Sequence, residues 1–227
     1  MSATYFFSFR SPYSWLASIA LKRRIEQGNE FELVPFWEPD AVSQKMLASR
    51  KGEFPYRKMS DAKHRYILRD IKRLADKFGV AVKWPVDASP WWEPSHLGYL
   101  KARELGFGLP FFWGVYRARW QEGADISAPA VIERVCRDIG MSGEEAGQVA
   151  GAPDSEAIRR WGSDTLYRIY REDIFGVPMF TRKRRQYWGL DRLNDFLEML
   201  GSDPLPEEEL PLAKGYPLDF DHAGGCG

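Results

Sequence analysis

The residues with the clearest chemical potential lie near the start of the chain, in the segment Ser11-Pro12-Tyr13-Ser14. Ser11 is a typical helix cap, and Pro12 suits the first helical position because the N–H that proline lacks would have no partner there. A helix N-terminus presents backbone N–H groups and about half a positive charge, and a serine hydroxyl there can donate to an anion. Ser11 is therefore a candidate anion-binding residue, and the alternative is that it only caps the helix.

Two charged residues are further candidates. Asp191 lies in the first turn of the last predicted helix, where the helix dipole favours a carboxylate in any protein, so a purely stabilising role is its alternative. Lys63 lies near the start of another predicted helix, where a cation is mildly unfavourable, and this argues slightly against a purely decorative position. The alternative for Lys63 is a solvated basic face shared with Arg57, Lys58 and Arg65.

The sequence predicts neither a metal site nor a disulfide framework. The three histidines, His64, His96 and His222, are far apart, and no spacing of carboxylates accompanies them. Cys136 and Cys226 are also distant from each other, and the chain contains no C-x-x-C motif.

The composition is that of a globular protein. Of 227 residues, 44% are hydrophobic, and 32 basic residues balance 32 acidic ones, so we expect a buried core and no net field that would attract nucleic acid or a membrane surface. The start has no basic segment ahead of an apolar run, and no 18 apolar residues follow one another. We therefore expect a cytoplasmic protein. The basic run 182–185 leaves open contact with an acidic partner or RNA, but such a run is usually a solvated turn.

The elements that must position the candidate residues alternate between strand and helix at the N-terminus. Residues 4–9 are aromatic and typical of a strand, a helix runs from Ser11 through Ile25, and a second strand covers 31–36. The middle of the chain, 40–170, has mainly helical patterns. Its predicted helices are 67–78, 118–122, 129–139 and 155–170, with a Trp- and Pro-rich loop at 84–94.

Strand patterns return near the C-terminus. Residues 178–181 and 186–188 predict a hairpin with a charged tip at 182–185, and a helix follows over 190–200. The sequence thus predicts an α/β domain formed by residues 1–38 and 172–202, an all-helical insertion at 39–171, and an irregular surface extension at 203–227.

Three motifs in this order resemble one known family. The segments S-P-Y-S-W-L-A (11–17), I-F-G-V-P-M-F (174–180) and W-G-L-D-R-L (188–193) are similar to those of 2-hydroxychromene-2-carboxylate isomerases and the related kappa-class glutathione transferases. The resemblance covers about residues 4–200 and implies a thioredoxin-like fold of the DsbA type, a β-α-β and β-β-α sheet split by a helical insertion. In redox members of this fold the first turn carries two cysteines, and a chain with Ser11 and Ser14 there cannot exchange disulfides.

The resemblance also implies a cofactor, glutathione, whose thiolate would be stabilised at Ser11 and the helix N-terminus. It implies that Val177, before a cis proline, pairs with the peptide backbone of glutathione, although an edge strand beginning with proline is the alternative. Lys63 would hold a carboxylate of glutathione or of the substrate. The implied glutathione contacts are Ser11, Val177, Trp188, Gly189, Leu190 and Asp191, and Leu190 replaces the family's usual Asn or Ser.

The implied reaction is isomerisation of 2-hydroxychromene-2-carboxylate or its ring-opened form, o-hydroxybenzylidenepyruvate. The thiolate adds to the electrophilic carbon, the double bond becomes single and rotates, and the thiol is expelled. The resemblance also leaves open a kappa-like transferase or a non-catalytic binding protein on the same scaffold. It further implies a homodimer.

Overall fold

The computed structural model describes residues 3–28, 30–56, 60–87 and 89–212. Its centre is a four-stranded sheet in the order β2-β1-β3-β4, formed by β1 (Ala3–Phe7), β2 (Phe31–Pro35), β3 (Met179–Arg182) and β4 (Arg185–Trp188). β1 pairs in parallel with β2 and antiparallel with β3, and β3 pairs antiparallel with β4. The predicted order of a β-α-β unit, a helical segment and a β-β-α unit is therefore confirmed.

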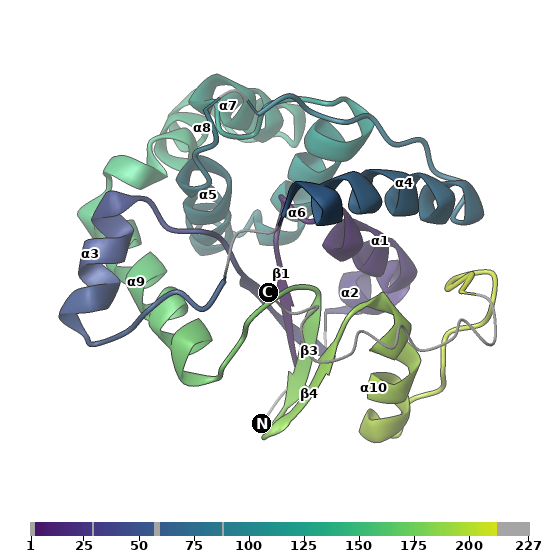
Figure 1. Ribbon diagram of the computed structural model, residues 1–227. Coiled ribbons are helices and arrows are strands. Elements are labelled where there is room, and N and C mark those ends of the chain that lie inside the picture. The colour runs from purple at the N-terminus through teal and green to yellow at the C-terminus, as the bar shows by residue number, and fades with distance from the viewer. Residues whose placement is uncertain (1–2, 29, 57–59, 88, 213–227) are drawn as a thin grey trace.

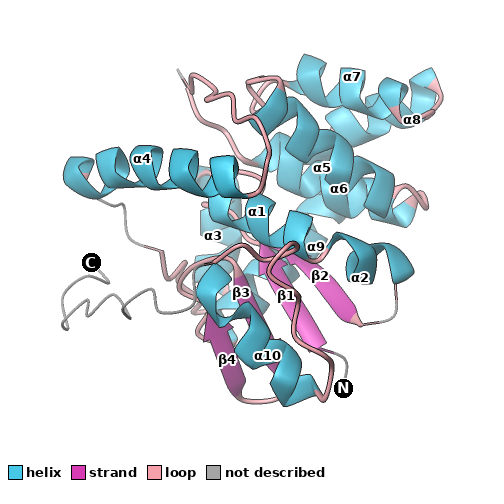
Figure 2. Ribbon diagram, turned by 90° about the vertical axis from the view of Figure 1, so that its right-hand side faces the viewer, coloured by secondary structure: helices cyan, strands magenta, loops and turns pink. Residues whose placement is uncertain are grey.

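Helices surround this sheet (Figure 1). In Figure 1, α3 and α9 lie to one side of the strands, α10 to the other, and α5 to α8 above them, while Figure 2 shows α4 extending over α1. The helices are α1 (Pro12–Ala20), α2 (Lys22–Gln27), α3 (Ala41–Ser49), α4 (Asp61–Lys77), α5 (Glu93–Glu104), α6 (Gly108–Tyr116), α7 (Pro129–Asp138), α8 (Gly143–Ala150), α9 (Glu156–Arg171) and α10 (Leu193–Leu200). Shorter turns are the π-helical η1 (Arg117–Gln121) and the 3-10 turns η2 (Ala152–Asp154) and η3 (Leu190–Arg192).

Several predicted boundaries change. The first strand ends at Phe7 rather than at residue 9. The helix predicted through Ile25 is two helices, because the backbone leaves helical geometry at Leu21 (φ −89°, ψ 6°). The segment 118–122 is the π-helical continuation of α6, and the last helix begins with the 3-10 turn η3. The predicted loop 84–94 ends earlier, because α5 starts at Glu93.

The β3–β4 hairpin has a shorter tip than predicted. Arg182 pairs with Arg185 in the ladder, so the turn itself is only Lys183-Arg184, with Lys183 at a φ of 58°. β4 is an edge strand with mainly exposed side chains. Because cations on an edge strand discourage pairing with a second sheet, this charge pattern fits an exposed edge.

An aromatic cluster packs α5 and α6, two of the helices between β2 and β3, against β1. It comprises Phe7, Phe9, Tyr99, Phe112 and Tyr116, all of them buried. The Phe7 ring lies 4.8 Å from Phe112 and 5.2 Å from Tyr99, both edge to face, and Phe9 lies 5.2 Å from Tyr116. Edge-to-face contacts of this kind add to the free energy of burial. α5 and α6 therefore share one core with β1.

A polar network ties the segment after β2 to α3 and α9. Asp40 caps α3, because its Oδ1 accepts the Ser43 N–H at 2.8 Å. The same oxygen pairs with Arg159 on α9 at 2.7 Å, and Oδ2 accepts the Trp91 indole N–H at 3.1 Å. Burial opposes ionisation of Asp40, but the hydrogen bonds from Arg159, Ser43 and Trp91 outweigh it and lower the pKa of Asp40 to about 2.

Glu93 lies beside this network and is fully buried. Its Oε1 accepts the Asp40 N–H at 2.7 Å and the Trp37 indole N–H at 3.3 Å, whereas its Oε2 has no partner among the described residues. Burial raises the pKa of Glu93, in the direction opposite to that of Asp40.

The low pKa of Asp40 predicts that the free energy of unfolding falls in acid. Because folding lowers this pKa from 3.8 to about 2, the stabilisation is present above about pH 4 and is lost as the pH falls through about 2. We expect Asp40→Asn to flatten the dependence of unfolding free energy on pH between these limits. Urea unfolding of both proteins at several pH values between about 2 and 4 measures the two slopes. Equal slopes would refute the assignment to Asp40.

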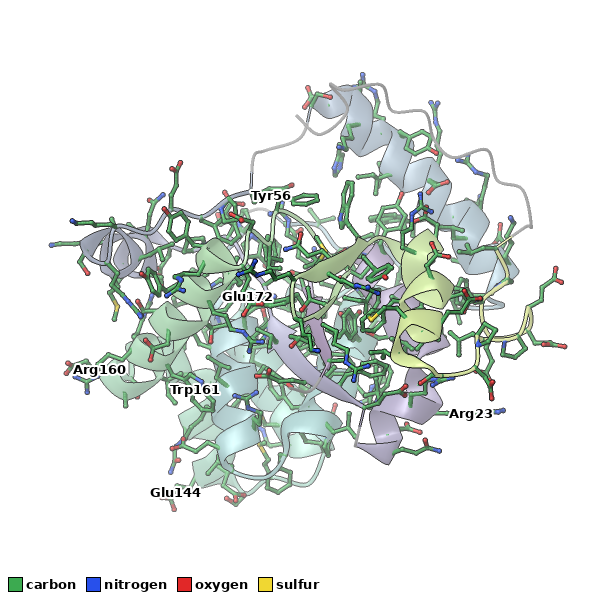
Figure 3. The ribbon with its side chains drawn as sticks, turned by 90° about the horizontal axis from the view of Figure 1, so that it is seen from below. Arg23, Tyr56, Glu144, Arg160, Trp161 and Glu172 are labelled. Atoms are coloured by element: carbon green, nitrogen blue, oxygen red, sulfur yellow. The ribbon has the colours of Figure 1, made fainter. Side chains whose placement is uncertain are left out.

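The described part of the C-terminal extension, 203–212, forms no helix or strand and is anchored to the body. Leu205 and Leu210 are buried, and Arg23 pairs with Glu209 at 3.0 Å. Residues 213–227, with His222 and Cys226, lie outside the described residues. Figure 3 shows Arg23, Glu144 and Arg160 at the rim, pointing away from the sheet. No helix among the described residues is long and apolar enough to cross a membrane.

Candidate active site

Ser11 caps α1 as predicted. Its Oγ accepts the Ser14 N–H at 3.2 Å, and its backbone is extended (φ −87°, ψ 116°). Pro12 is the first helical residue and has no N–H, and the Tyr13 N–H has no hydrogen-bond partner among the described residues. Ser11 is partly exposed. A hydroxyl and one backbone N–H are therefore available together at this helix end.

The segment I-F-G-V-P-M-F (174–180) contacts Ser11 directly, although it is distant in the sequence. The Val177–Pro178 peptide bond is cis, as the resemblance implied. The Ser11 hydroxyl donates to the Val177 C=O over 3.5 Å, a distance at which a hydrogen bond is weak. A stronger acceptor placed at this point would therefore compete well for the Ser11 proton.

The segment W-G-L-D-R-L (188–193) contacts both the 174–180 segment and α1. The Gly189 N–H donates to the Pro178 C=O at 2.9 Å, and η3 packs against α1. Gly189 has a φ of 102°, and a Cβ there would lie 2.6 Å from an Asp191 carboxylate oxygen, so only glycine fits. The Asp191 side chain is 61% exposed and pairs with Arg192 at 2.8 Å. The Leu190 side chain is buried, so any contact it makes with a ligand is through its backbone.

Trp188 forms an exposed border of this region. Its side chain is 42% exposed, and its ring lies 5.1 Å from the similarly exposed Phe175. A Cβ on Gly176 would lie 3.0 Å from the Trp188 indole nitrogen, so this glycine lets the indole lie close to the backbone before Val177. Phe175 and Gly176 were not among the predicted site residues.

Lys63 is on α4, which packs against α1. The contact is fixed by the Tyr13 hydroxyl, which donates to the Asp70 carboxylate at 2.7 Å. Lys63 precedes Asp70 by two helical turns, so both lie on the same half-buried face of α4. Lys63 therefore lies on the side of α4 that faces the body of the protein.

The turn between β1 and α1 is also held by side chains from the helices between β2 and β3. The Tyr116 hydroxyl donates to the Ser8 C=O at 3.2 Å, and the Trp120 indole N–H donates to the Phe9 C=O at 3.0 Å. The His96 ring contacts the same turn. None of these three residues was predicted as part of the site.

Two arginines bring positive charge close to this turn. The Arg119 side chain is 3% exposed and makes two hydrogen bonds to Asp87, at 2.9 and 2.7 Å. The Arg10 and Arg119 guanidinium groups lie 5.2 and 5.1 Å from the Trp92 ring. Arg10, the residue before Ser11, pairs with Glu38 at 3.0 Å. Each arginine is paired with a carboxylate, and the charges of both act on the His96 ring beside the turn.

Neither thiol nor metal chemistry has candidate residues in the described part of the chain. Cys136, the one cysteine there, lies in α7, and burial raises its pKa to about 12, so it holds its proton at neutral pH. No group of three or more His, Cys, Asp or Glu side chains in these ranges is arranged to hold a metal ion.

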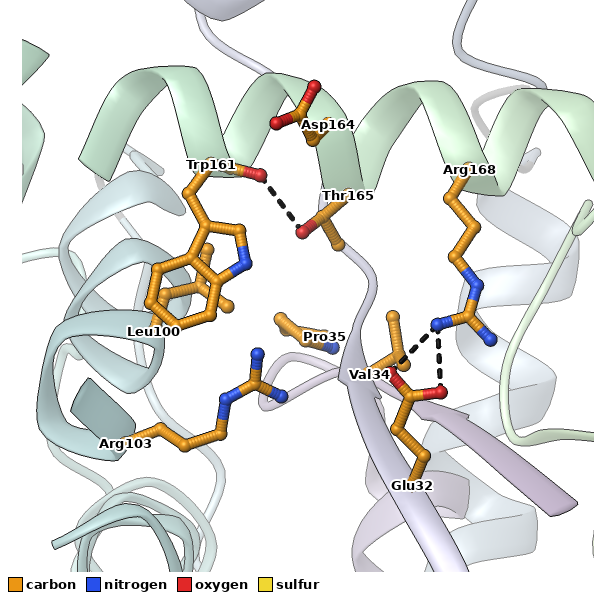
Figure 4. A pocket seen from close by; sticks show the side chains of 9 residues that line it. All are labelled: Glu32, Val34, Pro35, Leu100, Arg103, Trp161, Asp164, Thr165 and Arg168. Carbon is orange, nitrogen blue, oxygen red and sulfur yellow. Dashed lines mark hydrogen bonds and ion pairs between the residues drawn. The ribbon is translucent and has the colours of Figure 1, made fainter. Parts of the chain in front are cut away.

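Two cavities lie elsewhere, along the outer edge of β2. One, of about 380 Å³, is lined by Phe31 and Tyr99 among others, and the other, of about 170 Å³, by Val34 and Trp161. Arg103 lines both, and Figure 4 shows it pointing toward Trp161, whose ring lies 4.7 Å from the guanidinium carbon. Neither cavity is lined by a predicted site residue.

The chain is similar to known proteins over most of its length. It is 26% identical over 197 residues to the 2-hydroxychromene-2-carboxylate isomerase of Sphingobium xenophagum, which covers 86% of this chain and 94% of that protein. A solved 2-hydroxychromene-2-carboxylate isomerase superposes with a TM-score of 0.69 at 19% identity, covering 88% of this chain and 95% of the other. The cytosolic disulfide reductase DsbM of Pseudomonas aeruginosa, solved with GSH, has a TM-score of 0.59 at 20% identity, covering 88% and 98%.

These similarities confirm the predicted fold class and the resemblance to the 2-hydroxychromene-2-carboxylate isomerases. The DSBA-like thioredoxin domain model matches residues 4–201, a range that begins in β1, spans the helices between β2 and β3, and ends after α10. The sheet order and the cis proline opposite the start of α1 agree with that match. The chain belongs to the DSBA-like thioredoxin family.

Proposed function

We propose that this protein is a glutathione-dependent isomerase that acts on 2-hydroxychromene-2-carboxylate, its ring-opened form or a related aromatic acid. The observation that carries the proposal is the Ser11 hydroxyl at the N-terminus of α1, 3.5 Å from the Val177 C=O beside a cis proline. The similarity to an isomerase over most of the chain supports the reaction class. Ser11 and Ser14 in place of a thiol pair support a reaction without disulfide exchange.

The residues present fit glutathione. The Ser11 O–H and the Tyr13 N–H can both donate to its sulfur, and the N–H of Val177 has no partner among the described residues and can pair with its peptide backbone. The exposed Asp191 carboxylate can pair with the γ-glutamyl ammonium group. When bound, glutathione supplies a thiolate that adds reversibly to the electrophilic carbon of the substrate.

The protein's own part is to stabilise negative charge and to position the substrate. The α1 N-terminus and the Ser11 hydroxyl lower the free energy of a sulfur anion relative to the thiol. We assign Lys63 to the substrate carboxylate, because it lies on the face of α4 toward α1.

A glutathione titration by calorimetry, followed by an assay with 2-hydroxychromene-2-carboxylate, tests the proposal. We expect binding in the micromolar to millimolar range, about 4 to 8 kcal/mol, and isomerisation with no net loss of glutathione. Stoichiometric consumption of glutathione would indicate a kappa-like transferase instead. Absence of glutathione binding would refute the proposal and favour a non-catalytic role.

Substitution of Lys63 tests the placement of the substrate. We expect Lys63→Met to raise the KM for the acidic substrate about tenfold at saturating glutathione and to change kcat by less than about twofold, because a charge-assisted hydrogen bond is lost. Lys72→Met, at an exposed position of the same helix, is the matched control and should leave KM unchanged. Equal effects of the two variants would place Lys63 in the solvated basic face.

A further inference from the structure

His96, on α5, begins a chain of hydrogen bonds that ends beside Ser11. The imidazole is fully buried. Its Nδ1 lies 2.8 Å from the Trp92 carbonyl oxygen, and its Nε2 lies 3.3 Å from the Phe9 backbone nitrogen and 3.2 Å from the Ser8 hydroxyl. One ring thus joins α5 to the turn between β1 and α1.

The partners of the ring determine its tautomer. A backbone N–H can only donate, so Nε2 must present its lone pair to Phe9, and a carbonyl oxygen can only accept, so Nδ1 must carry a proton for Trp92. The Ser95 hydroxyl, 3.1 Å from Nδ1, donates to the Trp92 carbonyl at 3.2 Å and can accept from the same Nδ1–H. His96 is therefore the neutral Nδ1–H form. A proton on Nε2 would point at the Phe9 N–H, and this contact would become repulsive.

Ser8 carries the interaction from His96 to Ser11. Its hydroxyl can donate to the His96 Nε2 while accepting the Arg10 N–H at 3.3 Å. Its carbonyl accepts the Ser11 N–H at 3.1 Å. The His96 Nε2 thus reaches the backbone before Ser11 through Ser8 and Phe9, alongside the contacts from Tyr116 and Trp120.

The surroundings keep this acceptor free of a proton. Burial lowers the pKa of His96 to about 3, opposed by the hydrogen bond to Trp92 and reinforced by the charges of Arg119 and Arg10. The lone pair of Nε2 is therefore available throughout the physiological pH range.

We infer that His96 is a positioning residue: its Nε2 lone pair fixes the Ser8–Ser11 turn so that the Ser11 hydroxyl and the Tyr13 N–H face the sulfur of glutathione. The inference rests on the proposed function for its catalytic consequence. The neutral Nδ1–H imidazole holds the turn whatever reaction the protein catalyses.

Two variants separate positioning from packing. In His96→Gln the side-chain carbonyl can replace Nε2 as the acceptor for Phe9, whereas in His96→Asn the amide can replace only the Nδ1–H donor to Trp92. We expect His96→Gln to keep kcat within about fivefold of wild type, and His96→Asn to lower kcat about 100-fold with KM for glutathione within about threefold. Equal kcat in the two folded variants would overturn the inference.

Nitrogen-15 spectra of the imidazole test the same point without an assay. We expect His96 to remain neutral with its proton on Nδ1 between about pH 5 and 8, and the amide signals of Phe9 and Arg10 to move in His96→Asn but much less in His96→Gln. An Nε2–H or doubly protonated ring would overturn the inference. If the wild type proves inactive on the chromene, the proposed function fails, and these spectra still decide the role of His96.

Discussion

Replacing Ser11 with alanine is expected to lower kcat for glutathione-dependent isomerisation about 100- to 1000-fold, the usual cost of removing one donor to a developing anion. The variant loses the O–H that lies 3.5 Å from the Val177 C=O and keeps the Tyr13 N–H. We also expect the pKa of bound glutathione to rise, because a hydrogen bond to the charged form is removed. The pH dependence of the thiolate absorbance measures this shift.

The control for Ser11 is another helix-capping serine. The Ser155 side chain caps α9 by accepting the Ile158 N–H at 3.4 Å, so Ser155→Ala removes the same kind of cap away from the proposed site. Each variant should lose about 1 kcal/mol of unfolding free energy, and only Ser11→Ala should lose activity. If Ser11→Ala keeps more than a third of wild-type kcat, Ser11 only caps the helix.

Phe112→Ala is expected to lower the free energy of unfolding by about 3 to 5 kcal/mol, a large part of the stability of a typical domain. Phe112 is fully buried in the aromatic cluster, with its ring 4.8 Å from Phe7 and 4.9 Å from Tyr116. Its removal leaves a cavity between α6 and the central strand. Urea unfolding followed by tryptophan fluorescence measures the change.

A phenylalanine outside the core provides the comparison. Phe175 is 43% exposed, so Phe175→Ala should cost less than about 1 kcal/mol. If the two variants lose similar stability, the aromatic cluster is not the contact that joins the helices to β1. An unchanged slope of unfolding free energy against urea concentration is expected, because the helices and the sheet share one core and unfold together.

Several elements that position the candidate site could be predicted, because the residues that determine them lie within the same short segments. Ser11 and Pro12 predict the start of α1 by capping and by the missing N–H. The strand on each side of Lys183-Arg184 and the helix 156–171 follow from patterns within a few residues. The cis bond before Pro178 followed from the family resemblance rather than from a local rule, since most bonds before proline are trans.

The parts that were not predicted depend on contacts distant in the sequence. His96 is one histidine in a segment rich in Trp and Pro, and only the fold brings its ring to Phe9. Tyr116 and Trp120 likewise reach the turn after β1 from α6 and η1. In α5 and α6 the buried side chains lie on all sides of each helix instead of along one face, because both helices are mostly buried. The sequence of either helix therefore lacks the one-sided apolar pattern that predicts a surface helix.

The position of β1 has a consequence for the order of folding. The first strand of the chain is an interior strand of the sheet, and Tyr5 pairs with Phe180, which is synthesised much later. Until β3 is made, one edge of β1 has no strand partner, and closing the long loop costs entropy before the pairing compensates it. We expect the sheet to be the slow step of folding, because a chain emerging from the ribosome completes it only after both arms of the β3–β4 hairpin are available.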